Sequence, residues 1–260
     1  SDIMKTPTVR GISALIDKAN HAEDMALRAF EKRERYPLSE NQRGLYIEWE
    51  INRNTTQYNI PAVYRFRDAN AHALVQAVKA AVEAHPCLKI RLVTENEEVM
   101  QQRHDDERVE VTVVTPDHDP DQEYFQQRVR PFDLFRDRLY RFEVIDAPSG
   151  VYLFMDIHHI LFDGLSATVF LRDVQKAYRG EILTPERYDA CDFALHERKL
   201  LDSDETREAE GYFDSLLSEA EVLRWPDSVH PDGTADAMVQ TAIPAQSINA
   251  FCASEGVTVN

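Results

Sequence analysis

The apolar positions of this chain follow a helical period in several stretches. The clearest predicted helix covers residues 68–85, where apolar side chains recur on one face. Asp68 or Asn70 can cap its start, and Pro86 stops it. A second helical stripe closes at Gly180. Further helices are expected over residues 119–130, 189–201 and 205–221.

Strands are expected mainly as hairpins. One hairpin joins residues 87–93 to 99–104 through the charged turn TENEE, and another joins residues 139–146 to 151–157 through APSG. Residues 109–115 alternate as a third strand beside the first hairpin. Two more strands are expected over residues 62–68 and 238–244. This mixture predicts an α/β sandwich of the α+β kind, with a mixed, mostly antiparallel sheet and helices packed on it, and not a doubly wound sheet.

Composition narrows the classes of function. The chain has 260 residues, 43% of them hydrophobic, which is enough for a packed core. Its formal net charge of -17 repels phosphate backbones, so nucleic-acid binding is not expected. No apolar run is long enough for a membrane span, and SDIMKTPTVR has no signal-peptide core. Cys87, Cys191 and Cys252 form no CxxC pair, which argues against a disulfide framework or a cysteine zinc site and favours the cytoplasm.

The sequence DIHHILFDG, residues 156–164, carries the clearest chemical signal. It contains an H-H-x-x-x-D-G pattern where a buried strand stops and an amphipathic helix begins. Successive side chains of a strand point to opposite faces, so one of His158 and His159 should face a cavity and the other the scaffold. A neutral imidazole there can accept a proton from a nucleophile or position it. Asp163 can orient a histidine or pair with a cation, and Gly164 can supply backbone geometry that a side chain would block.

Two other interpretations of this pattern stay open. The histidines can be structural, as a single histidine at a strand end often is. They can also ligate a metal together with Asp163. Adjacent histidines on a strand diverge and no third histidine is near in sequence, so we expect no metal. Five further histidines are interpreted as surface or helix-capping residues: His85, His104, His118, His196 and His230.

Several spaced segments together resemble a known family. Residues 37–46 (PLSENQRGLY) are similar to its opening motif through Ser39, Gln42 and Arg43, and DIHHILFDG is similar to its third and defining motif. The other similar segments are YNIP at 58–61, AHPCLKIRL at 84–92 with His85, RPFDLFRDRLYR at 130–141, RYDACDFALHE at 187–197, and Tyr212-Phe213. On these motifs the chain resembles a condensation domain of a nonribosomal peptide synthetase, within the chloramphenicol acetyltransferase-like superfamily.

The resemblance implies a division of the chain. Residues 37–225 are similar to the N-terminal lobe of the domain, and residues 226–260 to the crossover into its C-terminal lobe. Residues 1–20 resemble the last helix of a peptidyl carrier protein, with residues 21–36 as a linker. Because the family's domain has two lobes with a tunnel between them, we expect a chain cut from a longer polypeptide at both ends, with little activity alone. Exposed surface between the lobes would favour a homodimer.

The resemblance also implies a reaction. An upstream carrier domain presents an acyl or peptidyl thioester, a downstream carrier presents an aminoacyl thioester, and an amide forms between them. Both substrates are held on phosphopantetheine arms of the carriers, so no cofactor is expected in this chain. A downstream adenylation domain is the other expected partner. His159 is the expected catalytic residue, as a proton acceptor or as the group that holds the amine, with His158, Asp163 and Gly164 completing the motif.

One position departs from the family. The motif aspartate there pairs with an arginine of the second motif, and the matching residue here is Lys89. Arg91 lies two residues on, hence on the same strand face. We therefore expect Asp163 to pair with Arg91 or Lys89, and a lysine pair would lack the bidentate fork of arginine.

Two alternative functions stay open. An epimerization domain shares the motif, although LSATVFL after it lacks the tryptophan usual in such domains. A non-catalytic docking or scaffold module of a synthetase would retain the motif for folding. The complete His-His-Asp-Gly set argues against the second alternative.

Overall fold

A four-stranded sheet is the centre of the fold. The computed structural model describes residues 29–30, 32–218, 220 and 243–258, besides Thr8 and Arg10. The predicted helix over 6–20 and strand over 238–244 lie almost entirely outside these residues. The chain divides into two units, Ser1–Phe213 and Asp214–Asn260, which are described separately.

In the first unit the sheet has the order β2-β7-β6-β5. The strands are β2 (Asn59–Phe66), β5 (Thr112–Val114), β6 (Tyr140–Ala147) and β7 (Gly150–His158). The predicted β6–β7 hairpin is confirmed, and β2 pairs antiparallel with β7. The turn between β6 and β7 requires glycine, because Gly150 has φ +141° and a Cβ there would lie 2.7 Å from the carbonyl oxygen of Phe66.

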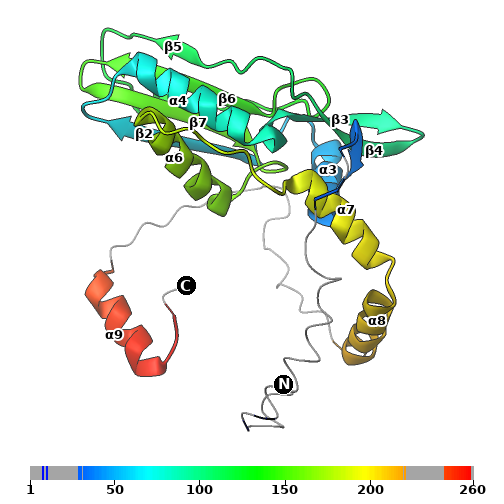
Figure 1. The fold of residues 1–260 in the computed structure, drawn as a ribbon. Helices are drawn as coiled ribbons and strands as arrows, with labels where there is room; N and C mark the ends of the chain where they lie inside the picture. The colour runs from blue at the N-terminus through cyan, green and yellow to red at the C-terminus, as the bar shows by residue number, and fades with distance from the viewer. Residues whose placement is uncertain are drawn as a thin grey trace, which may run out of the picture. The chain divides into compact units, whose positions relative to one another are not determined.

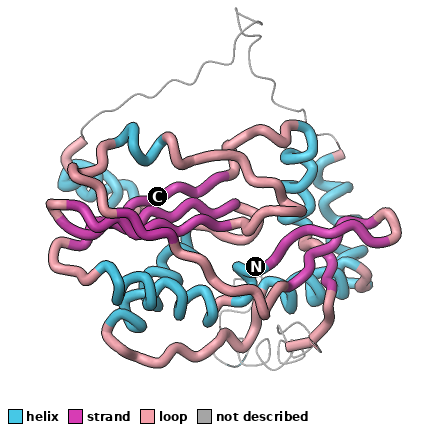
Figure 2. The backbone as a smooth tube through the Cα atoms, turned by 90° about the horizontal axis from the view of Figure 1, so that it is seen from above, coloured by secondary structure: helices cyan, strands magenta, loops and turns pink. Residues whose placement is uncertain are grey.

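A smaller sheet of order β1-β4-β3 is antiparallel throughout and stands at one end of the larger one (Figure 2). Its strands are β1 (Arg35–Pro37), β3 (Ile90–Glu95) and β4 (Glu98–Arg103). The predicted β3–β4 hairpin is confirmed, with positive φ at Asn96 and Glu97 in its turn.

The third strand of this hairpin was predicted wrongly. Within residues 109–115 only β5 forms, and it pairs parallel with β6 in the other sheet. The real third strand, β1, lies inside the predicted linker over 21–36. Alternation of apolar residues reveals the buried face of a strand but not its partner, and three residues are too few to show a period.

Two helices, α4 (Ala71–Ala84) and α6 (Gly164–Tyr178), lie against one face of the four-stranded sheet (Figure 1). Their apolar stripes form the main core with alternate residues of β6 and β7, and its largest fully buried side chains include Leu74, Leu153, Met155, Ile157 and Phe170. Of the two predicted caps for α4, Asn70 is the one used, accepting from the backbone nitrogen of Ala73 at 2.9 Å.

The other helices of the first unit are α3 (Glu40–Ile51), the 3-10 helix η2 (Pro86–Lys89), α5 (Gln122–Gln126), α7 (Ala190–Leu201) and the start of α8 (Asp204–Leu217). The second unit contains the end of α8 and the helix α9 (Ala245–Glu255). Helix α5 is much shorter than the predicted 119–130, a stretch bounded by Pro120 and Pro131. No helix in the described part of the chain is long and apolar enough to cross a membrane.

Candidate functional site

The histidine pair lies where β7 leaves the four-stranded sheet. The backbone nitrogen of His158 donates to the carbonyl of Leu139 at 2.9 Å, which lies just before β6. The backbone nitrogen of His159 donates to the carbonyl of Tyr58 at 2.8 Å, just before β2. The chain at both histidines is therefore fixed by neighbouring strands on either side of β7.

The side chain of His158 belongs to the scaffold. It is 3% exposed, and its ring centroid lies 6.0 Å from that of Phe132 in an edge-on arrangement. Its Nδ1 accepts a hydrogen bond from the backbone nitrogen of Ile160 at 3.1 Å. Burial, together with the charge of His159, lowers the pKa of His158 to about 4, so the ring is neutral near neutral pH.

The side chain of His159 points the other way, as predicted for successive strand residues. It is exposed, and its imidazole makes no hydrogen bond to the described part of the chain. The ring of Tyr58 lies edge-on to it, with 6.5 Å between centroids. His159 borders a hollow of about 550 Å³ between the starts of α3, α6 and α7, whose other walls include Gln42, Leu45, Phe162, Ser166, Ala190 and Phe193.

Asp163 is the N-cap of α6. One carboxylate oxygen accepts from both the backbone nitrogen and the Oγ of Ser166, each at 2.7 Å. These hydrogen bonds from Ser166 lower the pKa of Asp163, so the carboxylate stays ionised. Asp163 thus fixes the start of α6 through Ser166, and not through a histidine or a cation as the sequence predicted.

The predicted pairing of Asp163 with Arg91 or Lys89 is wrong. Lys89 is buried and its Nζ donates to Glu83 at 2.6 Å and to the carbonyl of Asp105 at 3.0 Å. Arg91 donates to both carboxylate oxygens of Glu107, at 2.6 and 2.7 Å. Both cations are therefore paired with carboxylates other than Asp163. The pair of Arg91 with both oxygens of Glu107 is of the strong, charge-assisted kind.

The Nε of Arg91 donates to the carbonyl of Asp137, at 3.0 Å. The expectation for Gly164 is also wrong: its φ is not in the left-handed region, and a Cβ would meet no atom within 4 Å. The small residue leaves open space at the start of α6 instead of relieving strain.

The opening motif supports the histidine loop from α3. Ser39 and Gln42 form a capping box, in which each side chain bonds the other residue's backbone nitrogen. The Nε2 of Gln42 also donates to the carbonyl of Ile160 and to the Oε1 of Gln101, both at 3.2 Å. Arg43, by contrast, is exposed and pairs only loosely with Glu40 on its own helix.

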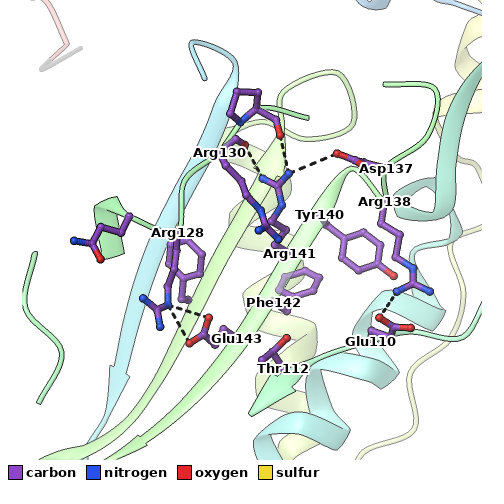
Figure 3. A pocket seen from close by; sticks show the side chains of 13 residues that line it. Glu110, Thr112, Arg128, Arg130, Asp137, Arg138, Tyr140, Arg141, Phe142 and Glu143 are labelled. Carbon is purple, nitrogen blue, oxygen red and sulfur yellow. Dashed lines mark hydrogen bonds and ion pairs between the residues drawn. The ribbon is translucent and has the colours of Figure 1, made fainter. Parts of the chain in front are cut away.

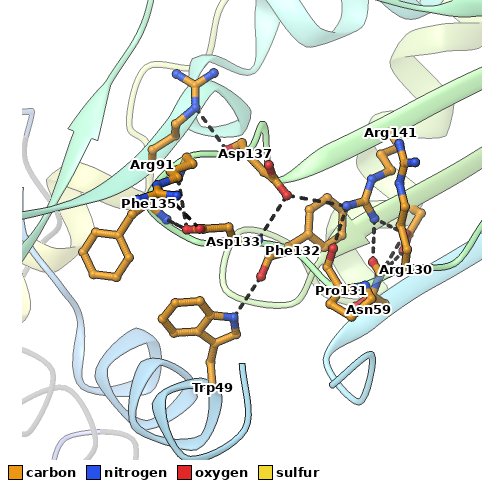
Figure 4. Close-up of polar contacts among 12 residues, drawn as sticks. Trp49, Asn59, Arg91, Arg130, Pro131, Phe132, Asp133, Phe135, Asp137 and Arg141 are labelled. Atoms are coloured by element: carbon orange, nitrogen blue, oxygen red, sulfur yellow. Dashed lines mark hydrogen bonds and ion pairs between the residues drawn. The ribbon is translucent and has the colours of Figure 1, made fainter. Parts of the chain in front are cut away.

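A buried ion pair that the sequence did not reveal anchors β7. Asp156 is 0% exposed and accepts from the Nδ2 of Asn59 at 2.9 and 3.0 Å and from Arg141 at 2.9 Å. Arg141 also donates to the carbonyls of Arg130 and Pro131 and lies over the ring of Phe132 (Figure 4). Burial raises the pKa of Asp156 against the opposing effect of Asn59 and Arg141. A charged residue in an otherwise apolar strand was the available signal.

Arg141 also borders a hollow of about 680 Å³ (Figure 3). This hollow contains no residue of the DIHHILFDG motif and is rich in arginines. Among the described residues, no three His, Cys, Asp or Glu side chains are grouped so that they could hold a metal ion.

The mixed, mostly antiparallel sheet with helices packed on it has the fold of the chloramphenicol acetyltransferase-like lobe that the sequence predicted. The chain belongs to the Condensation domain family, whose model matches residues 32–260. The resemblance inferred from its motifs is thereby confirmed.

Peptide synthetases are among its relatives. Tyrocidine synthase 2 of Brevibacillus parabrevis is 28% identical over 214 residues, covering 82% of this chain and 6% of that protein. Surfactin synthase subunit 1 of Bacillus subtilis (strain 168) is 25% identical over 228 residues, covering 86% of this chain and 6% of that protein. The chain therefore spans only a small part of the synthetases it matches.

Solved structures support the fold. The X-domain in its complex with OxyB from teicoplanin biosynthesis matches with a TM-score of 0.67 and 22% identity, covering 90% of this chain and 56% of that one. The starter condensation domain of the rhizomide synthetase RzmA matches with a TM-score of 0.62 and 15% identity, covering 73% of this chain and 49% of that one. The chain thus spans about half the length of these domains.

Proposed function

We propose that this chain is part of a condensation domain that forms an amide between two carrier-bound substrates. The donor is an acyl or peptidyl thioester and the acceptor an aminoacyl thioester, both held on phosphopantetheine arms of carrier domains. The relatives named as tyrocidine and surfactin synthases support this assignment. Carrier domains on both sides and a downstream adenylation domain are the partners that this reaction requires.

The observation that carries the proposal is the opposite exposure of the two histidines. His158 is buried, neutral and already hydrogen-bonded, so it cannot reach a substrate. His159 faces a hollow of about 550 Å³, and its imidazole makes no hydrogen bond to the residues that the structure describes. An imidazole at the end of a rigid strand is well placed to accept or hold a proton.

The reaction assigns His159 a specific proton. The acceptor amine attacks the donor carbonyl, a C–N bond forms, and the C–S bond of the donor thioester breaks. The amine loses one proton, which His159 takes or directs, and the leaving thiolate of the donor arm gains one. Holding two reactants at attack distance lowers the barrier by itself, so orientation of the amine by His159 contributes even without full proton transfer.

Other motif residues act through His159. The Asp163 cap and the Gln42 hydrogen bond to Ile160 fix the two ends of the loop that carries it. The space beside Gly164 leaves room for a substrate arm near the imidazole. We assign these three residues positioning roles and His159 the catalytic one.

The direct test is His159→Ala in the intact synthetase, followed by the amount of condensed product on the downstream carrier. We expect at least a hundredfold loss of product formation, with unchanged loading of both carriers. His72→Ala is the matched control, because His72 is exposed on α4 away from the motif. Undiminished product from the His159 variant would contradict the proposal.

A second candidate is a non-catalytic docking module. The observation that favours it is the X-domain, which matches over 90% of this chain and is described in complex with OxyB. Under this function His159→Ala would leave product formation intact. An epimerization domain, the other alternative, would be recognised by inversion of the carrier-bound residue without formation of a new amide.

A further inference from the structure

A histidine outside the proposed catalytic site is held by two carboxylates. His85 caps the C-terminus of α4, and its side chain is 8% exposed. Its Nδ1 lies 2.9 Å from the Oε1 of Glu186, in the segment of residues 181–188 before α7. Its Nε2 lies 3.1 Å from the Oδ2 of Asp173 on α6. One imidazole therefore joins three separate parts of the first unit.

These two contacts determine the charge of the ring. An ionised carboxylate only accepts hydrogen bonds, and a neutral imidazole has a single N–H to donate. Asp173 is held ionised, because hydrogen bonds from Lys176 and Arg172 outweigh the effect of its burial and lower its pKa. Two carboxylate partners thus require both ring nitrogens of His85 to be protonated.

The other groups around the ring favour the same state. The hydrogen bond that His85 donates to Glu186 outweighs burial and raises the pKa of His85 above its ordinary value. On η2, burial raises the pKa of Cys87 to about 12, so the thiol is neutral. Other charged groups of the neighbouring elements include Arg172 and Lys176 on α6, which bond Asp173. Lys89 on η2 pairs with Glu83, and Asp189 before α7 pairs with Arg103. Glu181 and Arg187 lie in the segment of residues 181–188, where Arg187 stacks over Tyr188.

The joined parts form a wall of a second hollow beside the histidine loop. This hollow, of about 530 Å³, is lined by His85 and Glu186 on one side and by Leu161, Phe162 and Asp163 of the loop on the other. Release of Glu186 would let the 181–188 segment move away from the loop, since the segment contains no helix or strand of its own.

We propose that His85, as an imidazolium, is a positioning residue that ties α6 and the 181–188 segment to the end of α4 and so fixes the wall of this hollow. The role does not depend on which reaction His159 serves. A group whose pKa is raised by folding stabilises the structure fully below its ordinary pKa of about 6.5, and that stabilisation is lost as the pH rises through the folded-state value. The 181–188 segment is therefore held tightly at pH 6 and loosens at alkaline pH.

Two measurements on the 260-residue chain test this. Histidine side-chain 15N spectra should show both nitrogens of His85 protonated at pH 6.0, with a titration midpoint above 6.5. Amide hydrogen exchange over residues 181–188, corrected for intrinsic pH dependence, should be about tenfold faster at pH 6 in His85→Gln than in the wild type. The glutamine amide is uncharged, and its two N–H donors share one nitrogen, so it cannot replace the two separate N–H groups of an imidazolium. His72→Gln, an exposed position on the same helix, should match the wild type.

A neutral His85 ring at pH 6.0, or unchanged amide exchange over residues 181–188 in His85→Gln, overturns the proposal. If His85→Gln does not fold, Glu186→Gln removes the charge of the more exposed partner alone. That variant should remain folded and lower the His85 midpoint, and an unchanged midpoint would contradict the assigned role.

Discussion

Two hollows of the first unit present polar groups in opposite ways. The larger one, about 680 Å³, is lined by four arginines, yet Arg128, Arg138 and Arg141 are each engaged by a carboxylate (Figure 3). The hollow beside His159, about 550 Å³, has fewer charges, but its imidazole is not hydrogen-bonded to the described residues. The charged groups of the first hollow are therefore mostly paired with one another. The second hollow contains the exposed imidazole of His159, which we propose as the catalytic group.

The two regions are adjacent along β7. Asp156 pairs with Arg141, which lines the larger hollow, and His159 follows Asp156 by three residues. A buried ion pair contributes to a fold only when every partner is in place, because desolvation of each charge is costly. The Asp156 carboxylate has hydrogen bonds from both Asn59 and Arg141, whereas the side chain of His159 makes none to the described residues.

The largest effect is expected from removing one partner of the buried ion pair between Asp156 and Arg141. Arg141→Ala would leave the Asp156 carboxylate, 0% exposed, without its cation. We expect the free energy of unfolding in urea to fall by about 3–5 kcal/mol. Arg130→Ala is the matched control, since the Arg130 side chain is exposed and has no ion pair within the described chain, and should change it by less than about 0.5 kcal/mol. Equal losses in the two variants would show that the ion pair is not structural.

The burial of His158, in contrast to the exposure of His159, can be tested by measuring how the free energy of unfolding depends on pH. Its folded-state pKa of about 4 lies below its ordinary value of 6.5, so between these pH values the unfolded chain binds a proton that the folded chain does not. Stability should therefore fall as the pH falls from 7 to 4, by up to about 3 kcal/mol from this group. His158→Asn keeps an acceptor for the Ile160 nitrogen but does not titrate. Urea unfolding at several pH values should show a shallower acid loss in the variant, and parallel curves would contradict the assignment.

A smaller effect is expected from the support of the histidine loop. Gln42→Ala removes half of the capping box and leaves the carbonyl of Ile160 without its side-chain donor. We expect a loss of about 1–2 kcal/mol in unfolding free energy. Asn41→Ala, exposed on the same helix turn, should be nearly neutral. A loss of similar size in both variants would mean that Gln42 acts only through helix propensity.

Periodicity predicted those parts of the fold in which local pattern and buried face coincide. The helix containing Leu74 and Val78, the β6–β7 hairpin and the opposite exposure of His158 and His159 all follow from side-chain direction. The family resemblance then led us to expect that residues 37–225 form one lobe of a two-lobed domain. These features depend on residues close in sequence.

Features that depend on distant partners could not be predicted. Arg91 lies on β3 as expected, whereas Lys89 ends the 3-10 helix η2. Their carboxylates come from α4 and from the chain after β4, whose positions no sequence pattern gives. The His85 contacts reach Asp173 and Glu186, 88 and 101 residues away. Asp156 could have been flagged as a charge needing a partner, although Arg141 could not have been chosen among the arginines.

The contrast between the two adjacent imidazoles is tested most directly by their reaction with diethyl pyrocarbonate, followed by tandem mass spectrometry that separates the two sites. The folded chain should acylate at His159 at a rate within a few-fold of exposed His72, while His158 should stay unmodified until the protein unfolds. Modification of His158 as fast as His159, or protection of His159 in the folded chain, would contradict the account.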